Sequence, residues 1–558
     1  MDVINKTIKE LYDIIMASVR QASDAGKLPP EPVSEFSVEI PADSANGDFS
    51  ANVAMVNAKT FRMAPSKIAE IIRQEIHVDQ TFIQDVQTAG PGFINFFVND
   101  TWFSKAIRDI LEQKENYGRS DFGKSKKINV EFVSANPTGP MHIGNARGGA
   151  LGDTLAEVLN RAGYSASREF YINDGGSQMR KFGLSLNARY LQIICGENKV
   201  PFPEDGYKGA DIIERAQAFY EIHGDKYAGC DETERIGALV DYALPLNIEE
   251  LKSDLKEYRI EYDTWFKESI LYKNNEVEKV IKLLTDKGAT YPNDGALWFK
   301  ATNYGGEQDF VLLRSNGIPT YIVPDIAYHY NKLETRGFYK AIDVLGADHH
   351  GYLPRLKTAL KALGLDPDRL DFILMQMVRL IQDGEPVKAS KRTGKSITLR
   401  TLIDEVPIDA ARFFFNMREG NTHMDFDLDL AVEQSSKNPV YYVQYAYARI
   451  CKILQKSGET PEDYSLLNKL GSEHEHHLIR KLSLLPSEII NAAKAYDPSR
   501  LTRYIIETAA AFHKFYDKCR VIGEEEDIMK ARIMLCKSAQ IVIKNVLTIL
   551  KIEAPESM

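Results

Sequence analysis

The stretch that decides the fold is KKINVEFVSANPTGPMHIGNARGGALGD, residues 126–153. Its β-branched and aromatic residues over 128–133 predict a short buried strand. Residues 134–140 hold two prolines and a glycine, which cannot continue that strand and favour a turn. Apolar residues at helical spacing from Ala146 to Leu159 then predict a helix. The expected order is strand, tight turn, helix.

His142, Gly144 and Asn145 fall where this helix begins. The first N–H groups of a helix are unpaired and lie at the positive end of its dipole, so they bind phosphate. Gly144 lets a nucleotide approach the backbone closely, and His142 and Asn145 can donate hydrogen bonds to phosphate oxygens. The alternative is an ordinary helix cap with a satisfied histidine. The strand–turn–helix context and a second motif downstream favour the phosphate site.

A second strand, over 168–173, is predicted after the helix, which makes a βαβ unit with a parallel sheet. Ligands of such sheets bind beyond the carboxyl ends of the strands. Residues 180–295 are charged and helical, and we interpret them as an insertion into the sheet. The alternation of strands and helices is predicted to resume with strands over 309–313, 319–323, 341–346 and 372–378.

The second motif is GEPVKASKRTGK, residues 384–395. It crowds four cations into eight residues, which is unfavourable unless an anion binds there. Glycines at both ends would let the loop open and close over a ligand. An exposed basic turn is the simpler alternative for this loop alone.

Residues 118–125, GRSDFGKS, fit the phosphate-binding pattern G-x-x-x-x-G-K-S letter for letter. That pattern needs a strand before it and a helix after it. Here a helix is predicted over 102–113 and a strand over 128–133, so the order is reversed. We interpret the match as a coincidence within an interdomain linker.

The two motifs together resemble those of class I aminoacyl-tRNA synthetases. The SANPTGP lead-in is similar to that of the arginyl-tRNA synthetase family, and Lys388–Arg392 resembles the KMSKS signature with Ala389 in place of methionine. The HIGH signature ends in Asn145 here rather than histidine, and an amide can still donate a hydrogen bond. With its lead-in, the HIGH motif comprises Ala135, Asn136, Pro137, Thr138, Gly139, Pro140, Met141, His142, Ile143, Gly144 and Asn145.

The resemblance implies an α/β protein with a Rossmann-type parallel-sheet catalytic domain that carries an insertion. An N-terminal α+β domain and a C-terminal all-α helix bundle are expected to flank it. The implied domains are residues 1–120 for the tRNA-contacting N-terminal domain, 121–400 for the catalytic domain with its insertion at about 180–295, and 401–558 for the stem-contact and anticodon-binding bundle.

A site for a guanidinium needs carboxylates in a fixed arrangement, because arginine presents planar donors. Glu131 ends the first strand, and Asp325 is expected to begin a helix near a strand end. Asn136 and Asn173 add neutral acceptors. The arginine-binding set implied by these residues and the resemblance is Glu131, Ser134, Asn136, Asn173, Tyr321 and Asp325.

Further roles follow from the resemblance. The catalytic residues are expected to be His142, Asn145, Lys388 and Lys391. The ATP-binding residues are expected to be Gly139, Pro140, His142, Gly144, Asn145, Gly346, Asp348, His349, Lys388, Ser390 and Lys391. The tRNA-binding residues are expected to be Phe93, Asn95, Tyr441, Tyr445 and Arg449. The tyrosines are suited to stacking on unpaired bases, although core packing alone would explain such a cluster.

The implied reaction attaches L-arginine to tRNA(Arg) through an arginyl-adenylate and releases AMP and diphosphate. ATP is expected as its Mg²⁺ complex. The alternatives are a class I synthetase for another amino acid, a P-loop NTPase, and a non-catalytic tRNA-binding relative. Pyrophosphate exchange with each amino acid, the Lys124→Ala variant and a charging assay would separate them.

Composition narrows the setting. The 558 residues predict roughly three or four domains at about 150 residues each. A net charge of −10 argues against a nucleic-acid-binding coat over the whole surface but allows a local basic groove. The five cysteines are widely spaced, so we expect neither zinc nor disulfides. We interpret Asp348, His349 and His350 as ligand contacts rather than as a metal site. A cytoplasmic monomer without a membrane segment is expected.

Overall fold

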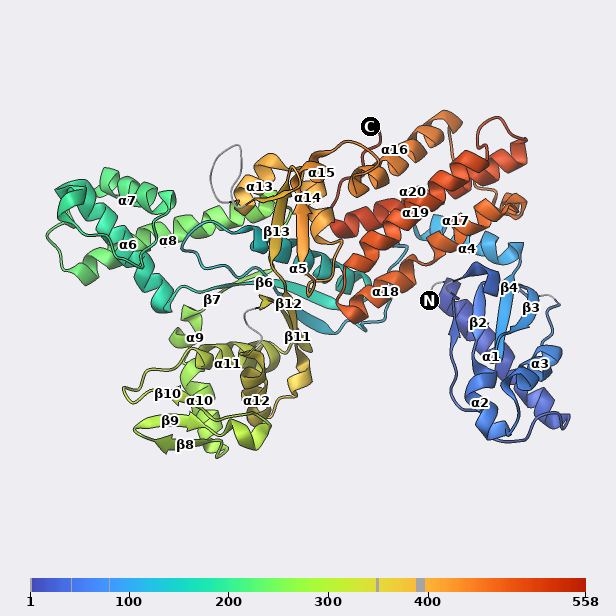
Figure 1. Ribbon diagram of the computed structural model, residues 1–558, viewed down its shortest axis with the longest axis horizontal. Coiled ribbons are helices and arrows are strands. Elements are labelled where there is room, and N and C mark those ends of the chain that lie inside the picture. Colours follow the sequence, from blue (N-terminus) through green and yellow to red (C-terminus); the bar gives the residue numbers. More distant parts are fainter. Residues whose placement is uncertain (1–2, 42, 80, 348–350, 388–396) are drawn as a thin grey trace.

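The computed structural model describes residues 3–41, 43–79, 81–347, 351–387 and 397–558. Four parts surround a central sheet (Figure 1): an N-terminal unit, a projecting helical unit, a small mixed unit and a C-terminal bundle. The expected residues Asp348, His349, Lys388, Ser390 and Lys391 lie outside the described ranges.

The N-terminal unit is an antiparallel sheet in the order β1-β2-β4-β3 with helices packed on it. Its elements are α1 (Val3–Asp24), β1 (Val38–Glu39), β2 (Phe49–Ala51), α2 (Val53–Phe61), α3 (Pro65–Glu75), β3 (Ile83–Ala89), β4 (Phe93–Val98) and α4 (Asp100–Gln113). The α1 helix buries Leu11, Ile15 and Val19 on one face, as its apolar spacing predicts.

The central sheet is parallel throughout, in the order β12-β11-β5-β6-β7. Its strands are β5 (Lys127–Glu131), β6 (Ser165–Ile172), β7 (Thr264–Lys267), β11 (Lys340–Gly346) and β12 (Leu370–Met375). Helix α5 (Ile143–Arg161) connects β5 to β6. The predicted βαβ unit is therefore confirmed. The GKS-containing stretch at 118–125 follows helix α4 and precedes strand β5, so its reversed context is confirmed too.

Two predictions for the middle of the chain are wrong. Strand β7 belongs to the central sheet although it lies inside the predicted insertion. Residues 319–323 do not form a strand, because helix α11 begins at Ile322 and the burial of Ile322 and Val323 in that helix overrides their β propensity. The strand predicted over 309–313 exists as β10, but it joins a separate antiparallel sheet, β10-β9-β8.

The remaining sequence between β6 and β12 forms two bodies. The projecting helical unit consists of α6 (Gly176–Cys195), α7 (Ala210–His223) and α8 (Glu232–Glu257). The small mixed unit contains α9 (Ser269–Lys273), α10 (Glu276–Asp286), β8 (Thr290–Asn293), β9 (Ala296–Phe299), β10 (Phe310–Leu313), α11 (Ile322–Tyr330) and α12 (Leu353–Leu363).

The C-terminal part begins with a small sheet and continues as a bundle. The sheet has the order β14-β13-β15, with β13 (Val378–Gln382), β14 (Glu385–Val387) and β15 (Met424–Asp427). The helices are α13 (Leu399–Glu405), α14 (Ile408–Phe415), α15 (Leu428–Val432), α16 (Pro439–Ser457), α17 (Glu473–Ser483), α18 (Leu485–Ala495), α19 (Ser499–Lys518) and α20 (Glu526–Leu550). The predicted combination of parallel α/β sheet, N-terminal α+β unit and C-terminal helices is confirmed.

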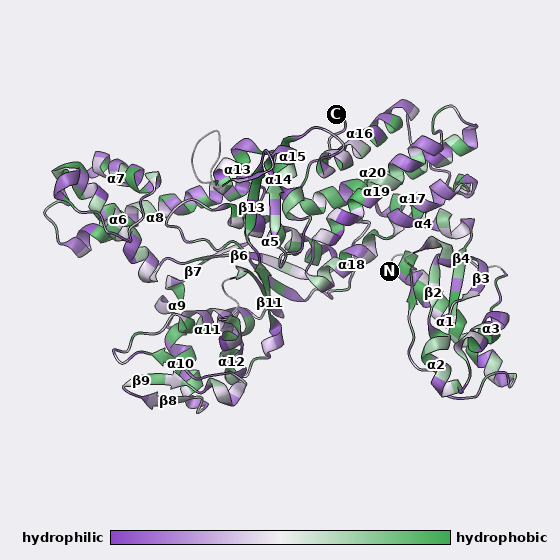
Figure 2. Ribbon diagram, viewed as in Figure 1, coloured by the Kyte–Doolittle hydropathy of each residue, from purple (hydrophilic) through white to green (hydrophobic). Residues whose placement is uncertain are grey.

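Hydropathy follows this arrangement. Figure 2 shows strands β4 and β11 largely in the hydrophobic colour, whereas the projecting helices α7 and α8 carry much hydrophilic colour. Among the described residues one helix, α20, is long and apolar enough to cross a membrane, but 72% of its most apolar window is buried inside the protein. Its burial marks α20 as a core helix of the bundle.

Candidate active site

The site begins at a strained turn after β5. Val133 and Ser134 have φ angles of 69° and 40°, a region that a β-branched residue such as valine rarely adopts. The turn is held because the Ser134 N–H donates to the Phe132 carbonyl at 3.0 Å and its hydroxyl donates to Glu131 Oε1 at 2.9 Å. The Ser134 hydroxyl also accepts the Tyr171 N–H at 3.1 Å. These hydrogen bonds join the ends of strands β5 and β6 beside the Glu131 carboxylate.

Helix α5 starts where the sequence predicts. His142 is its N-cap residue, and the His142 N–H donates to Asn145 Oδ1 at 2.9 Å. With its oxygen occupied in this way, the Asn145 amide keeps its NH₂ group for another acceptor. His142 and Gly144 are exposed, and among the described residues beyond its own chain neighbours and helix backbone, none has an atom within 4 Å of the place where a Cβ on Gly144 would stand. The helix end is therefore capped and open to a ligand.

The chain that follows the basic motif lies beside this helix end. Thr398, which follows the motif, forms an antiparallel bridge with His142, and the Leu399 N–H donates to the Met141 carbonyl at 2.8 Å. Strand β14, which precedes the motif, ends at Val387. After the basic motif, Thr398 and Leu399 thus lie against the residues that lead from strand β5 into helix α5, residues 134–142, which we call the phosphate turn.

A cleft of about 1320 Å³ opens at the carboxyl ends of the central strands. It gathers most of the predicted residues, namely Glu131, Ser134, Asn136, Gly139, Pro140, His142, Gly144, Asn145, Asn173, Asp325 and Gly346. Tyr321 is not in this lining; its side chain is 67% exposed, and its ring lies 5.7 Å from that of Tyr352.

A buried ionic cluster underlies one end of the cleft. Lys332 is fully buried, and its ammonium group lies 2.5 Å from Glu131 Oε2 and 2.9 Å from Asp343 Oδ1. His329 Nε2 lies 2.7 Å from Asp343 Oδ2. The Tyr352 hydroxyl donates to Asp325. Glu131 and Asp343 therefore have cationic partners, whereas Asp325 accepts a hydrogen bond from a neutral hydroxyl.

The electrostatics of this cluster are uneven. Burial raises the pKa of Asp325 above its usual range, and burial likewise raises the pKa of Glu131. Burial alone would raise the pKa of Asp343 too, but Lys332 and His329 outweigh it and hold that pKa well below its usual range. Asp343 is thus fully compensated, while Asp325 and Glu131 would be stabilised as anions by a further cation in the cleft.

Sequence reasoning missed Met377, which lines the cleft, and two buried residues that support it, Lys332 and Arg147. Lys332 is placed by a π-helical turn, Asn331–Thr335, and nothing in its local sequence marks it. Met377 is 81% exposed and lines the cleft just beyond the end of β12; such a residue at a strand end was a usable signal. Arg147 is fully buried and donates to the carbonyls of Gln376 and Glu419 at 2.8 and 2.9 Å, which ties the wall of the cleft to α5.

The expected tRNA-binding residues lie outside the cleft. Phe93 is 37% exposed on β4, but Asn95 is only 4% exposed and its Oδ1 accepts the Ser50 hydroxyl at 2.7 Å. On α16, Tyr445 is 40% exposed, and Arg449 donates to its hydroxyl at 2.9 Å. The remaining residue of this set, Tyr441, is partly exposed.

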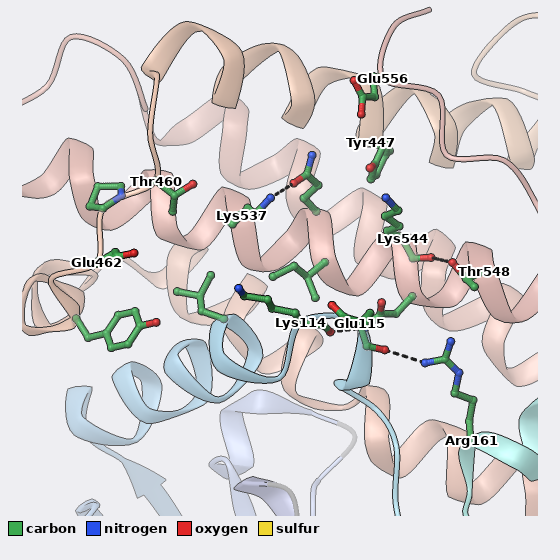
Figure 3. A pocket seen from close by; sticks show the side chains of 16 residues that line it. Lys114, Glu115, Arg161, Tyr447, Thr460, Glu462, Lys537, Lys544, Thr548 and Glu556 are labelled. Carbon is green, nitrogen blue, oxygen red and sulfur yellow. Dashed lines mark hydrogen bonds between the residues drawn. The ribbon is translucent and has the colours of Figure 1, made fainter.

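A second cavity, of about 540 Å³, lies between α4, α16 and α20 (Figure 3). Lys537 donates to Gln540 at 2.7 Å, and Arg161 donates to the Glu115 carbonyl at 2.9 Å. None of the residues predicted for catalysis, ATP or arginine lines it. The predicted chemistry is thus gathered in the cleft at the strand ends.

Comparison with known proteins agrees with this geometry. The family description "tRNA synthetases class I (R), catalytic domain" matches residues 106–436, "Arginyl tRNA synthetase N terminal domain" matches residues 3–98, and "DALR anticodon binding domain" matches residues 443–558. The fold and cleft therefore define a class I aminoacyl-tRNA synthetase.

Comparison with individual relatives identifies the family within this class. An arginine–tRNA ligase of Caldanaerobacter subterraneus is 54% identical over the full length of both chains, and one of Acetivibrio thermocellus is 51% identical over the full length of both. The solved arginyl-tRNA synthetase of Thermus thermophilus has a TM-score of 0.76 at 21% identity and covers 99% of this chain and all of its own. The chain belongs to the arginyl-tRNA synthetase family.

Proposed function

We propose that this chain, an arginine–tRNA ligase by family, carries out both half-reactions around the cleft at the strand ends. In the first, the arginine carboxylate attacks the α-phosphate of ATP and gives arginyl-adenylate and diphosphate. Positioning and charge stabilisation supply most of the catalysis in such a transfer. In the second, the 2′-hydroxyl of the terminal adenosine of tRNA(Arg) attacks the adenylate and releases AMP.

The ATP phosphates are assigned to the start of α5. The free N–H groups of the helix, the exposed His142 ring and the NH₂ group of Asn145 all serve as donors there. Lys388 and Lys391 would neutralise the charge that develops on the leaving diphosphate. Support for this role is the bridge between Thr398 and His142, which anchors the chain after the basic motif at the same helix end.

Arginine is assigned to the end of the cleft that contains Glu131 and Asp325. One observation carries this assignment: the buried Glu131 and the partly buried Asp325, two carboxylates whose pKa values are raised, share a cavity with the start of α5. A guanidinium would supply the missing positive charge and use its planar donors on both groups. Ser134, Asn136, Asn173 and Tyr321 would complete the contacts to arginine. A neutral analogue would leave the carboxylates unpaired and be rejected.

Mg²⁺ is expected to enter with ATP and to shield its phosphates. Among the described residues no group of three or more His, Cys, Asp and Glu side chains is arranged to hold a metal, which fits an ion carried largely by phosphates and water. Gly346, Asp348, His349 and Ser390 are proposed as further ATP contacts, and no role for zinc is proposed. We expect a monomer that acts in the cytoplasm.

The division of labour along the chain is also proposed. Residues 1–120 and 401–558 would hold tRNA on either side of the catalytic residues 121–400. Phe93, Tyr441, Tyr445 and Arg449 present partly exposed aromatic or cationic surface for stacking on bases. Asn95 is the least favoured of the set because it is buried and already bonded to Ser50.

The test is a charging assay with radiolabelled arginine and tRNA(Arg), together with pyrophosphate exchange for other amino acids. We expect charging with arginine alone and no use of citrulline, which has the same shape without the charge. His142→Ala should lower kcat/KM for ATP by about 10²-fold. Lys124→Ala, in the GKS-containing stretch, should leave activity unchanged; loss of ATP use in that variant alone would favour a P-loop enzyme.

A further inference from the structure

Helix α8 belongs to two hydrophobic cores. Leu239 and Ala243, in its first half, pack in the core of the projecting helical unit. Leu251 and Leu255, in its second half, pack in the main core that includes β5 and α5. Pro245 lies within the helix between these halves, where it removes one backbone hydrogen bond. The helix thus connects the helical unit to the catalytic core.

Asn247 lies at this junction and reaches the phosphate turn. It is 4% exposed, and its Nδ2 donates to the Pro137 carbonyl at 3.0 Å. Its Oδ1 accepts from Arg215 Nε on α7 at 2.9 Å, and Arg215 is held in turn by Glu250 at 2.5 Å. Because Arg215 takes the amide oxygen, the amide nitrogen is fixed toward Pro137.

The carbonyl that receives this bond is critically placed. Pro137 stands between Asn136, which lines the cleft on the arginine side, and Gly139 and Pro140, which line it near α5. Pro137 is buried and its carbonyl accepts the bond from Asn247, and a buried carbonyl left unpaired would be costly. The helical unit also lines the same cleft with Tyr207, Lys208 and Asp211.

We propose that Asn247 is a positioning residue for the activation step. It fastens to the helical unit the turn that would contact ATP and arginine, and Arg215 sets the orientation of the Asn247 amide. This inference rests on the proposed function of the cleft. No family motif discussed above includes Asn247, and Asn247 does not line the cleft. A shift of the helical unit would reach the turn through this bond, since it links α8 directly to the Pro137 peptide.

Asn247→Asp tests the proposal with a minimal change. The carboxylate keeps the shape and the acceptor for Arg215 but replaces the donor to Pro137 with a repelling oxygen. We expect kcat/KM in arginine-dependent pyrophosphate exchange, measured with saturating tRNA, to fall about tenfold. Most of the loss should appear as higher KM values for ATP and arginine, with kcat per titrated active site nearly unchanged. Arg215→Gln, which frees the amide to rotate, should show a loss of about threefold in the same parameter.

Asn187→Asp is the matched control. Asn187 is 8% exposed in the same helical unit, and its Oδ1 accepts from Arg235 Nε at 2.6 Å, but it has no bond to the turn. We expect its kcat/KM to stay within twofold of wild type. The proposal would be overturned if kcat/KM fell equally in the two Asp variants, or if Asn247→Asp lowered only the number of active sites. It would also be overturned if Asn247→Asp behaved like the wild type. If the wild-type enzyme failed to exchange pyrophosphate with arginine, the proposed function would fail instead.

Discussion

Two ionic clusters, one at the cleft and one around Asp153 of helix α5, are built with opposite excesses of charge. In the cleft cluster, Glu131 and Asp343 pair with Lys332 or His329, and the nearby Asp325 carboxylate accepts the Tyr352 hydroxyl. In the rear cluster, Asp153 receives Arg412 at 2.6 Å, Arg168 at 2.7 Å and Lys551 at 2.8 Å, and Arg168 also lies 3.6 Å from Glu157.

The difference in charge balance distinguishes a cluster that binds substrate from one that stabilises the fold. Burial tends to raise the pKa of Asp153, but Arg412 and Lys551 outweigh it and lower that pKa below its usual range. The pKa of Asp325 is raised instead. The direct partners of Asp153 are cations, whereas the direct side-chain partner of Asp325 among the described residues is the uncharged Tyr352 hydroxyl. We infer that the rear cluster fastens the bundle to α5, and that the cleft cluster is completed by substrate.

The largest expected effect comes from removing the unpaired carboxylate. Asp325→Asn should lower kcat/KM for arginine by about 10³-fold, or ~4 kcal/mol, because a buried guanidinium would lose its charged partner. The unfolding midpoint should stay the same or rise, since a poorly compensated buried charge has been removed. Pyrophosphate exchange and urea unfolding measure the two quantities. A substantial loss of stability with intact arginine affinity would reverse the roles assigned to the two clusters.

The opposite pattern is expected at the rear cluster. Asp153→Asn removes the carboxylate that Arg412, Lys551 and Arg168 share, and among the described residues only Arg168 keeps another, Glu157; the substitution should lower the free energy of unfolding by about 3–5 kcal/mol. Activity per folded molecule should hardly change, because Asp153 does not line the cleft. The control is Arg379→Ala, which breaks an exposed pair with Asp425 and should leave the free energy of unfolding nearly unchanged, because solvent screens such pairs. Equal costs for the two variants in urea unfolding would contradict the comparison.

A smaller effect should appear with pH. The guanidinium binds ionised carboxylates, and the pKa values of Asp325 and Glu131 are raised. Protonation of these carboxylates therefore begins above the ordinary carboxylate range of about 4. The KM for arginine should rise as the pH falls from about 8 toward that range. Below the raised pKa, the rise should reach up to about tenfold per pH unit. The KM for ATP serves as the reference. A flat arginine profile down to about pH 5 would indicate that the carboxylates are already compensated.

Local patterns in the chain were enough to predict the core of the site. The prolines and glycine of 134–140 end β5, and the apolar spacing after His142 continues as α5. The predictions were wrong where contacts with residues outside the predicted segment decide its secondary structure. Residues 319–323 have strand-forming composition, yet Ile322 and Val323 are buried in a helix. Strand β7 has only four residues, and pairing with β6 is what makes it a strand.

By itself, the sequence determined the strand–turn–helix unit, the capped helix start and the family to which the chain belongs, because neighbouring residues encode turn chemistry and helical spacing. Only the tertiary structure decided the charge balance of the two clusters. Lys332 meets Glu131 across 201 positions of the chain, and Arg412 meets Asp153 across 259. Such contacts depend on how the elements pack together, and whether a buried carboxylate lacks a cation is known only once all of its neighbours are in place.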